Sequence, residues 1–133
     1  MADRTFQTDC VCKQLNVMLY QARDRTLRLT ITNDIGDITG SKLWMSVKNT
    51  LDDADVDAVI TKLSANNGGS DQQAKVVDGV NRIIEFYVVP DDTRDLDSGD
   101  YWWDAVIELP SGRRLQLVDP SRFDLQRVAT LTS

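Results

Sequence analysis

The stretch that decides the fold runs from Arg82 to Arg127 and reads RIIEFYVVPDDTRDLDSGDYWWDAVIELPSGRRLQLVDPSRFDLQR. Apolar and aromatic residues form short runs, and turn-forming residues separate these runs at intervals of about ten residues. The turns are Ser98-Gly99, Pro110-Ser111-Gly112 and Asp119-Pro120. This spacing is typical of antiparallel sandwiches and barrels. We therefore predict four consecutive strands, the last one through Phe123 and Leu125.

The run from Tyr101 to Leu109 is the expected centre of the core. Successive side chains of a strand point to opposite faces. One set here is Tyr101, Trp103, Ala105, Ile107 and Leu109, and the other is Trp102, Asp104, Val106 and Glu108. A buried aromatic ring removes roughly 150–250 Å² from water. The first set is therefore predicted to face the core, and Leu115 and Leu117 continue that core on the next strand.

The first half of the chain repeats the same alternation. Its core sets are Leu27, Leu29 and Ile31, then Leu43, Met45 and Val47, and the second set leaves Trp44 on the outer face. Further strands are expected at 58–63, 74–77 and 84–88, with Pro90 ending the last of them. Because residues 64–73 carry Gly and amides without an apolar anchor, they are predicted to form a long mobile hairpin loop.

The predicted fold class is all-β, an immunoglobulin-like antiparallel β-sandwich of seven to nine strands. An eight-stranded closed barrel is the alternative. The immunoglobulin Cys-Trp-Cys framework is absent, so the likeness concerns architecture alone. Residues 1–20 are predicted to be an N-terminal arm, with a frayed terminus as the alternative, and residues 21–133 the sandwich domain.

Charge and hydropathy exclude two classes of partner. The net charge of −6, from 21 acidic and 15 basic residues, argues against a nucleic-acid surface, which needs a clustered positive footprint. No apolar run is long enough to span a bilayer, and residues 1–6 lack the apolar region of a secretory signal. We therefore expect neither nucleic acid nor membrane as a partner.

Cys10 and Cys12 are the two cysteines. They lie so close in the sequence that a bridge between them within one extended chain would be strained. We expect reduced thiols made in a cytosol, with a bond to a neighbouring copy as the alternative. Further Cys or His ligands for zinc are missing, because the chain contains no histidine.

The residue types argue against an enzyme. Without histidine the commonest general base and the usual Ser and Cys triads are absent. The segment from Asp95 to Asp100 partly imitates a calcium loop, but Val106 stands where an EF-hand needs its bidentate Glu. We therefore expect solvated acidic loops, no cofactor, no metal and no catalytic residues.

Three aromatic side chains, Trp44, Tyr87 and Trp102, are predicted to point away from the core. Aromatic residues on a sandwich surface serve as protein–protein anchors or as platforms that stack on sugars. We favour the protein anchor.

Two patches carry a family resemblance: Ile38–Lys48 (ITGSKLWMSVK) and Pro90–Asp104 (PDDTRDLDSGDYWWD), with Gly112 as a hairpin glycine. They resemble the small β-sandwich domains of tailed-bacteriophage virions, best known from the N-terminal domain of the phage baseplate upper protein. The resemblance extends over roughly residues 26 to 128, and its motifs shape corners. Asp119-Pro120-Ser121 departs from the glycine that many members carry there.

The resemblance implies a non-enzymatic structural protein of the virion, made in the host cytoplasm. We expect a capsid decoration (cement) protein, because no fibre or receptor-binding domain is expected after Ser133. A tail or baseplate component and a carbohydrate-binding module are the alternatives. The expected partners are the major capsid protein or tail and baseplate proteins, together with further copies in a dimer or trimer. The expected contact residues are Phe6, Val11 and Leu15 of the arm and the aromatics Trp44 and Trp102.

Overall fold

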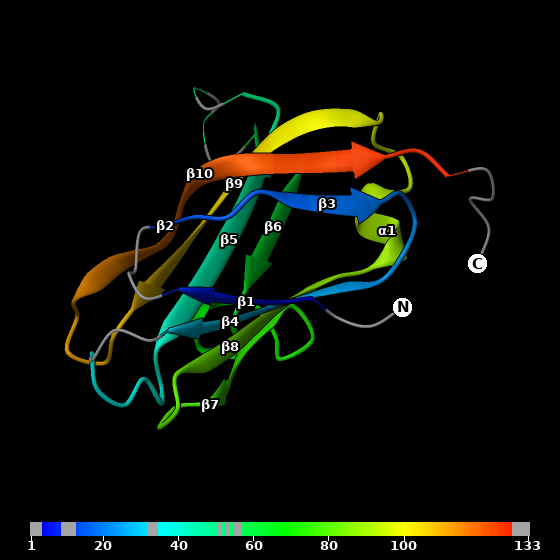
Figure 1. Cartoon of the computed structure of the whole chain (residues 1–133). Coiled ribbons are helices and arrows are strands. Elements are labelled where there is room, and N and C mark those ends of the chain that lie inside the picture. Colours follow the sequence, from blue (N-terminus) through cyan, green and yellow to red (C-terminus); the bar gives the residue numbers. More distant parts are fainter. Residues whose placement is uncertain are drawn as a thin grey trace.

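Two β-sheets pack face to face in the computed structural model, which describes residues 4–8, 13–31, 35–50, 52, 54 and 57–128 (Figure 1). The four-stranded sheet has the order β1-β4-β8-β7, and the six-stranded sheet has the order β2-β10-β9-β5-β6, with β3 also paired to β10. The strands are β1 (Arg4–Thr8), β2 (Lys13–Gln14), β3 (Val17–Tyr20), β4 (Arg25–Ile31), β5 (Lys42–Lys48), β6 (Ile60–Leu63), β7 (Ala74–Asp78), β8 (Ile83–Val88), β9 (Gly99–Glu108) and β10 (Arg114–Gln126).

The core lies between the sheets and follows the predicted alternation. All five residues of the predicted inward set are buried, four of them in β9 and Leu109 directly after it, and β9 lies between β5 and β10. The largest fully buried side chains are Trp103, Phe86 and Phe123, which come from both sheets. The prediction of an all-β sandwich is confirmed. Leu115, expected in the core, is half-buried at its margin.

The N-terminal segment is built into both sheets, and this corrects the prediction of an arm for the residues that the structure describes. β1 runs parallel to β4, and β2 and β3 run parallel to β10. Val17 and Leu19 are buried in the core. The pairing is therefore not wholly antiparallel. A chain that crosses from one sheet edge to the other satisfies the backbone groups of both edges.

The last strand is continuous through Pro120, where the sequence predicted a turn. Both halves of β10 pair with β9, and the register shifts between Gln116 and Val118 and again between Val118 and Ser121. Proline has no N–H to donate, and β-bulges are one of the few places in a sheet that accept it. The two shifts explain why one strand looks like two in the sequence.

Residues 64–73 connect the two sheets, so they are not a hairpin loop as predicted. β6 and β7 lie in different sheets, and between them a short 3₁₀ turn, η2 (Ala65–Asn67), lies against the start of β5. The Ser64 hydroxyl accepts the Leu43 N–H at 2.9 Å, and the Asn66 amide donates to the Gly40 carbonyl at 2.8 Å. Polar bonds replace the apolar anchor that the segment lacks.

One helical turn, α1 (Pro90–Thr93), joins β8 to β9 and ties the sheets together. The Asp92 carboxylate accepts the Val89 N–H at 2.8 Å and lies 2.6 Å from the buried Lys62 ammonium of β6. Just beyond it, the Tyr101 hydroxyl donates to the Asp97 carbonyl at 2.7 Å. This is the geometry of a tyrosine corner.

Candidate interaction surface

Trp44 and Trp102, the two predicted partner-facing aromatics, lie on the same outer face of the six-stranded sheet. They belong to the neighbouring strands β5 and β9, where Trp44 pairs with Val106 and Lys48 pairs with Trp102. Both indoles are half-buried. We call this surface the tryptophan face. It comprises Lys42, Trp44, Ser46 and Lys48 of β5, Asp100, Trp102, Asp104, Val106 and Glu108 of β9, and Arg114, Gln116, Arg122 and Asp124 of β10.

A hollow of about 360 Å³ opens on this face beside Trp44. Its walls include Val106 and Gln116, and the Arg114 guanidinium lies 5.0 Å from the centroid of the Trp44 ring. A cation at this distance from an indole is attracted by the ring quadrupole. The hollow therefore places Trp44 and Val106 beside charged and polar groups, and most of its exposed lining is polar.

A second, smaller hollow of about 70 Å³ lies at the other tryptophan. Trp102, Lys48 and Pro120 line it, and the bulged part of β10 supplies Pro120. Bulges redirect side chains near functional surfaces. The bulged part of β10 thus contributes directly to the surface around Trp102.

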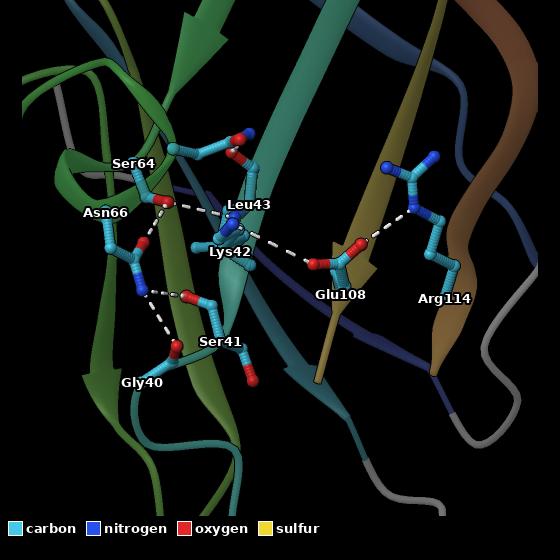
Figure 2. A network of polar contacts seen from close by, with 9 residues as sticks. Gly40, Ser41, Lys42, Leu43, Ser64, Asn66, Glu108 and Arg114 are labelled. Carbon is cyan, nitrogen blue, oxygen red and sulfur yellow. Dashed lines mark hydrogen bonds and ion pairs between the residues drawn. The ribbon is translucent and has the colours of Figure 1, made fainter. Parts of the chain in front are cut away.

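The charges of the face are paired at both of its ends. At the end drawn in Figure 2, the Glu108 carboxylate accepts the Arg114 Nε–H at 2.8 Å and lies 4.0 Å from the Lys42 ammonium. The hydrogen bond from Arg114 is the main reason why the pKa of Glu108 is lowered. At the opposite end Arg122 pairs with Asp100, and its hydrogen bond lowers the pKa of that carboxyl.

The face is electrically neutral on an acidic chain. Its basic residues are Lys42, Lys48, Arg114 and Arg122, and its acidic residues are Asp100, Asp104, Glu108 and Asp124. Four positive and four negative groups sum to zero, whereas the whole chain carries −6. The Asp104 carboxylate also accepts a hydrogen bond from the Gln116 amide at 2.9 Å. A neutral, internally paired surface loses little on desolvation compared with one that carries unpaired charges.

Of the predicted arm residues, Leu15 is the one whose side chain the structure describes, and it lies apart from Trp44 and Trp102. Leu15 is half-buried against the core; its N–H donates to the Ser121 hydroxyl at 2.9 Å, and its carbonyl accepts the Trp103 indole N–H at 2.9 Å. Phe6 lies in β1 opposite Leu29, and its side chain is outside the described part of the structure. Val11, Cys10 and Cys12 also lie outside the described residues.

The three outward aromatics do not form one platform for a sugar. Tyr87 is on the outer face of the other sheet, where its hydroxyl donates to Glu85. Burial, together with that hydrogen bond, raises the pKa of Tyr87. On the tryptophan face, Arg114 lies over the ring of Trp44. A ligand that stacks on Trp44 or Trp102 therefore cannot reach the ring of Tyr87.

The acidic loop between β8 and β9 is tied by cations of the chain itself. Asp92 pairs with Lys62, and Asp91 pairs with Arg94. Within the described ranges no cluster of three or more His, Cys, Asp or Glu side chains is placed to hold a metal ion.

Over the same residues, no helix has the length and apolar character needed to cross a membrane.

The sequence predicted the outward position of Trp44 and Trp102 but not the residues that surround them. The turn Pro110-Ser111-Gly112 could have predicted one of these neighbours, because a hairpin that turns there pairs Glu108 with Arg114. Val106 and Glu108 were already in the outward set predicted for this strand.

No family model matches the chain, and no curated protein sequence matches it.

Proposed function

We propose that this chain is a non-enzymatic structural protein of a bacteriophage particle that binds its neighbours through the tryptophan face. The observation that carries the proposal is the placement of Trp44 and Trp102 on one neutral outer sheet face, each beside a hollow. Aromatic residues in such settings dominate the energy of protein interfaces. The resemblance of residues 38–48 and 90–104 to phage β-sandwich domains supports the same function.

The proposal includes an immunoglobulin-like topology. The order β1-β4-β8-β7 in one sheet and β10-β9-β5-β6 in the other parallels the A-B-E-D and G-F-C-C′ order of variable-type sandwiches. The tyrosine corner at the start of β9 supports this assignment, since it occupies the same place in those domains. The parallel pairing of β1 with β4 is a feature of this chain.

Within the particle we favour the role of a capsid decoration protein, with a tail or baseplate component as the alternative. A decoration protein contacts the shell at many symmetric positions. Small contacts repeated in this way gain strength through effective concentration instead of through interface size. A sheet face of modest area with two aromatic anchors suits this mode of attachment.

The test is binding of the purified chain to phage shells and, separately, to tails that lack it. Trp102→Ala should weaken association about tenfold or more, the loss typical of an aromatic interface anchor. Tyr87→Ala is the matched control, because Tyr87 is an aromatic residue on the other sheet's outer face. It should bind like the unmodified chain.

Three outcomes would contradict the proposal. The first is equal binding by the Trp102→Ala and Tyr87→Ala variants. The second is binding to a glycan array that Trp102→Ala abolishes, without binding to shells or tails, which would indicate a carbohydrate-binding module. The third is turnover of a substrate by the purified chain.

A further inference from the structure

We infer that the tryptophan face binds a second copy of this chain, about a two-fold axis that runs parallel to β5 and β9 and between them. The inference rests on the proposed function, because it assigns an occupant to the same face: in the free chain a second copy covers the face, and a shell or tail competes with that copy for it. It depends on the register of these two strands and on where their charges lie.

The register fixes what such an axis brings together. β5 and β9 are adjacent, and their outward pairs are Lys42 with Glu108, Trp44 with Val106, Ser46 with Asp104, and Lys48 with Trp102. Rotation by half a turn about an axis between the strands, in the plane of contact, places β5 of one copy over β9 of the other. Each outward residue of β5 then meets the residue that is its cross-strand neighbour in its own chain.

The pairs created in this way are complementary. Lys42 meets Glu108 of the second copy twice, once on each side of the axis, and Trp44 meets Val106. Lys48 meets the Trp102 ring, a cation–π arrangement. Aligned packing of two sheets, with strand directions within about 30° of each other, is a common geometry for faces of this kind.

Glu108 has an oxygen available for the added contact. Its Oε1 accepts the Arg114 Nε–H at 2.8 Å, whereas its Oε2 lies 4.0 Å from its own Lys42, beyond hydrogen-bonding distance. Figure 2 shows Lys42, Glu108 and Arg114 in line across β5, β9 and β10. The Lys42 side chain is 47% exposed and that of Glu108 is 23% exposed, so both can be reached by another copy.

The net charge of the chain opposes self-association in general, and the neutral tryptophan face is where this repulsion is smallest. Two copies that each carry −6 repel one another. The tryptophan face sums to zero and keeps most of its charges paired within each copy, so it can approach itself without like charges in direct opposition. The outward charges of β5 are positive and those of β9 are negative. The two-fold axis places β5 of one copy over β9 of the other, so opposite charges face each other.

The size of the face sets the expected affinity. The axis also lays β10 of one copy over β6 of the other, so β6 belongs to the contact. The seven residues of β5 span about 23 Å, and the four strands from β6 to β10 span about 19 Å at the usual strand spacing. A patch of this size is at the low end for a specific interface, which averages about 800 Å² on each partner. We therefore expect a dimer with a Kd in the micromolar range.

A charge exchange followed by sedimentation velocity tests the inference. The unmodified chain should form dimers that increase with concentration. Lys42→Glu alone brings two carboxylates together across the axis, and Glu108→Lys alone brings two ammonium groups together, so each variant should be monomeric. An equimolar mixture of the two variants should recover the dimer, because each contact then joins a Glu to a Lys.

The recovery distinguishes the contact from a structural effect, since mixing cannot restore the pair between Lys42 and Glu108 within either chain. The matched control is Arg28→Glu, which breaks the cross-strand pair of Arg28 with Glu85, 2.8 Å apart, on the four-stranded sheet. This variant should dimerise like the unmodified chain. A circular-dichroism spectrum typical of β-sheet confirms that each variant is folded.

The inference is overturned if the unmodified chain stays monomeric at the highest concentration reached, or if the mixture of folded variants stays monomeric. It is also overturned if either single variant dimerises like the unmodified chain. Its failure is distinguishable from that of the proposed function. A monomer that binds shells through Trp102 refutes the dimer alone, and a dimer that binds neither shells nor tails refutes the proposed function alone.

Discussion

The outer faces of the two sheets differ, although their inner faces are alike. The inner faces share one core of alternating apolar side chains. Outward on the four-stranded sheet are Thr26, Arg28, Thr30, Ile83, Glu85 and Tyr87, which form a mostly polar surface with one aromatic ring. Outward on the six-stranded sheet are two tryptophans, two hollows and a set of paired charges. The inner faces explain the fold, and the difference between the outer faces is the basis of the proposal that contacts are made through the tryptophan face.

The largest expected effect is a difference in unfolding free energy between alanine variants of the two adjacent tryptophans of β9. Trp103 is 1% exposed and donates its indole N–H to the Leu15 carbonyl, whereas Trp102 points to the outer face. Trp103→Ala should lower the free energy of unfolding by about 3–5 kcal/mol. Trp102→Ala should lower it by about 1 kcal/mol. Urea denaturation followed by circular dichroism measures both, and equal losses would remove the distinction between the two faces.

A second large effect tests whether the N-terminal segment belongs to the six-stranded sheet. Leu19 in β3 is 1% exposed, and its neighbour Tyr20 is 43% exposed. Leu19→Ala should cost about 2–5 kcal/mol of unfolding free energy, and Tyr20→Ala should cost about 0.5 kcal/mol or less. Thermal and urea unfolding of the two variants provide the comparison. A Leu19→Ala variant as stable as the unmodified chain would contradict the burial of β3 in the sheet and would support the separate N-terminal arm that the sequence predicted.

A smaller effect concerns the tyrosine corner that begins β9. Tyr101→Phe removes the hydroxyl that donates to the Asp97 carbonyl and leaves the ring in place. The unfolding free energy should fall by about 0.5–1.5 kcal/mol, the usual net value of one hydrogen bond. Tyr20→Phe is the control, and no change is expected there. Identical urea midpoints for the Tyr101→Phe variant and the unmodified chain would count against this role of the hydroxyl.

The smallest effect is a pH dependence of the tryptophan face. Hydrogen bonds from Arg114 and Arg122 lower the pKa values of Glu108 and Asp100 in the folded chain. Their contribution to stability is therefore full above the unfolded pKa values, which are about 4, and is lost as the pH falls through the lowered folded values. Carboxyl NMR titration should give a higher pKa for Glu108 in Arg114→Gln. An unchanged pKa would show that Arg114 does not cause the shift.

The alternation of side chains made the sandwich predictable. Sets such as Leu43, Met45 and Val47 specify one buried face whatever the partner strands are, because the side-chain period of a strand is two. The same alternation placed Trp44 and Trp102 outward. Both predictions needed only local information.

The remaining features depend on long-range pairing, which local patterns do not encode. The register shifts in β10 let Pro120 lie within a strand, and the bonds of Ser64 and Asn66 to the start of β5 replace an apolar anchor. The parallel pairing of β3 depends on the exposed edge of β10. The sequence likewise could not show that Arg114 lies over Trp44, since this contact joins residues of two separate strands.

The most direct test of the central claim is hydroxyl-radical footprinting of the chain, free and assembled in the phage particle. We expect Trp44 and Trp102 to be protected from oxidation in the particle and Tyr87 to be labelled equally in both states. Protection of Tyr87 with unchanged labelling of the two tryptophans would contradict the assignment of the contact to the six-stranded sheet.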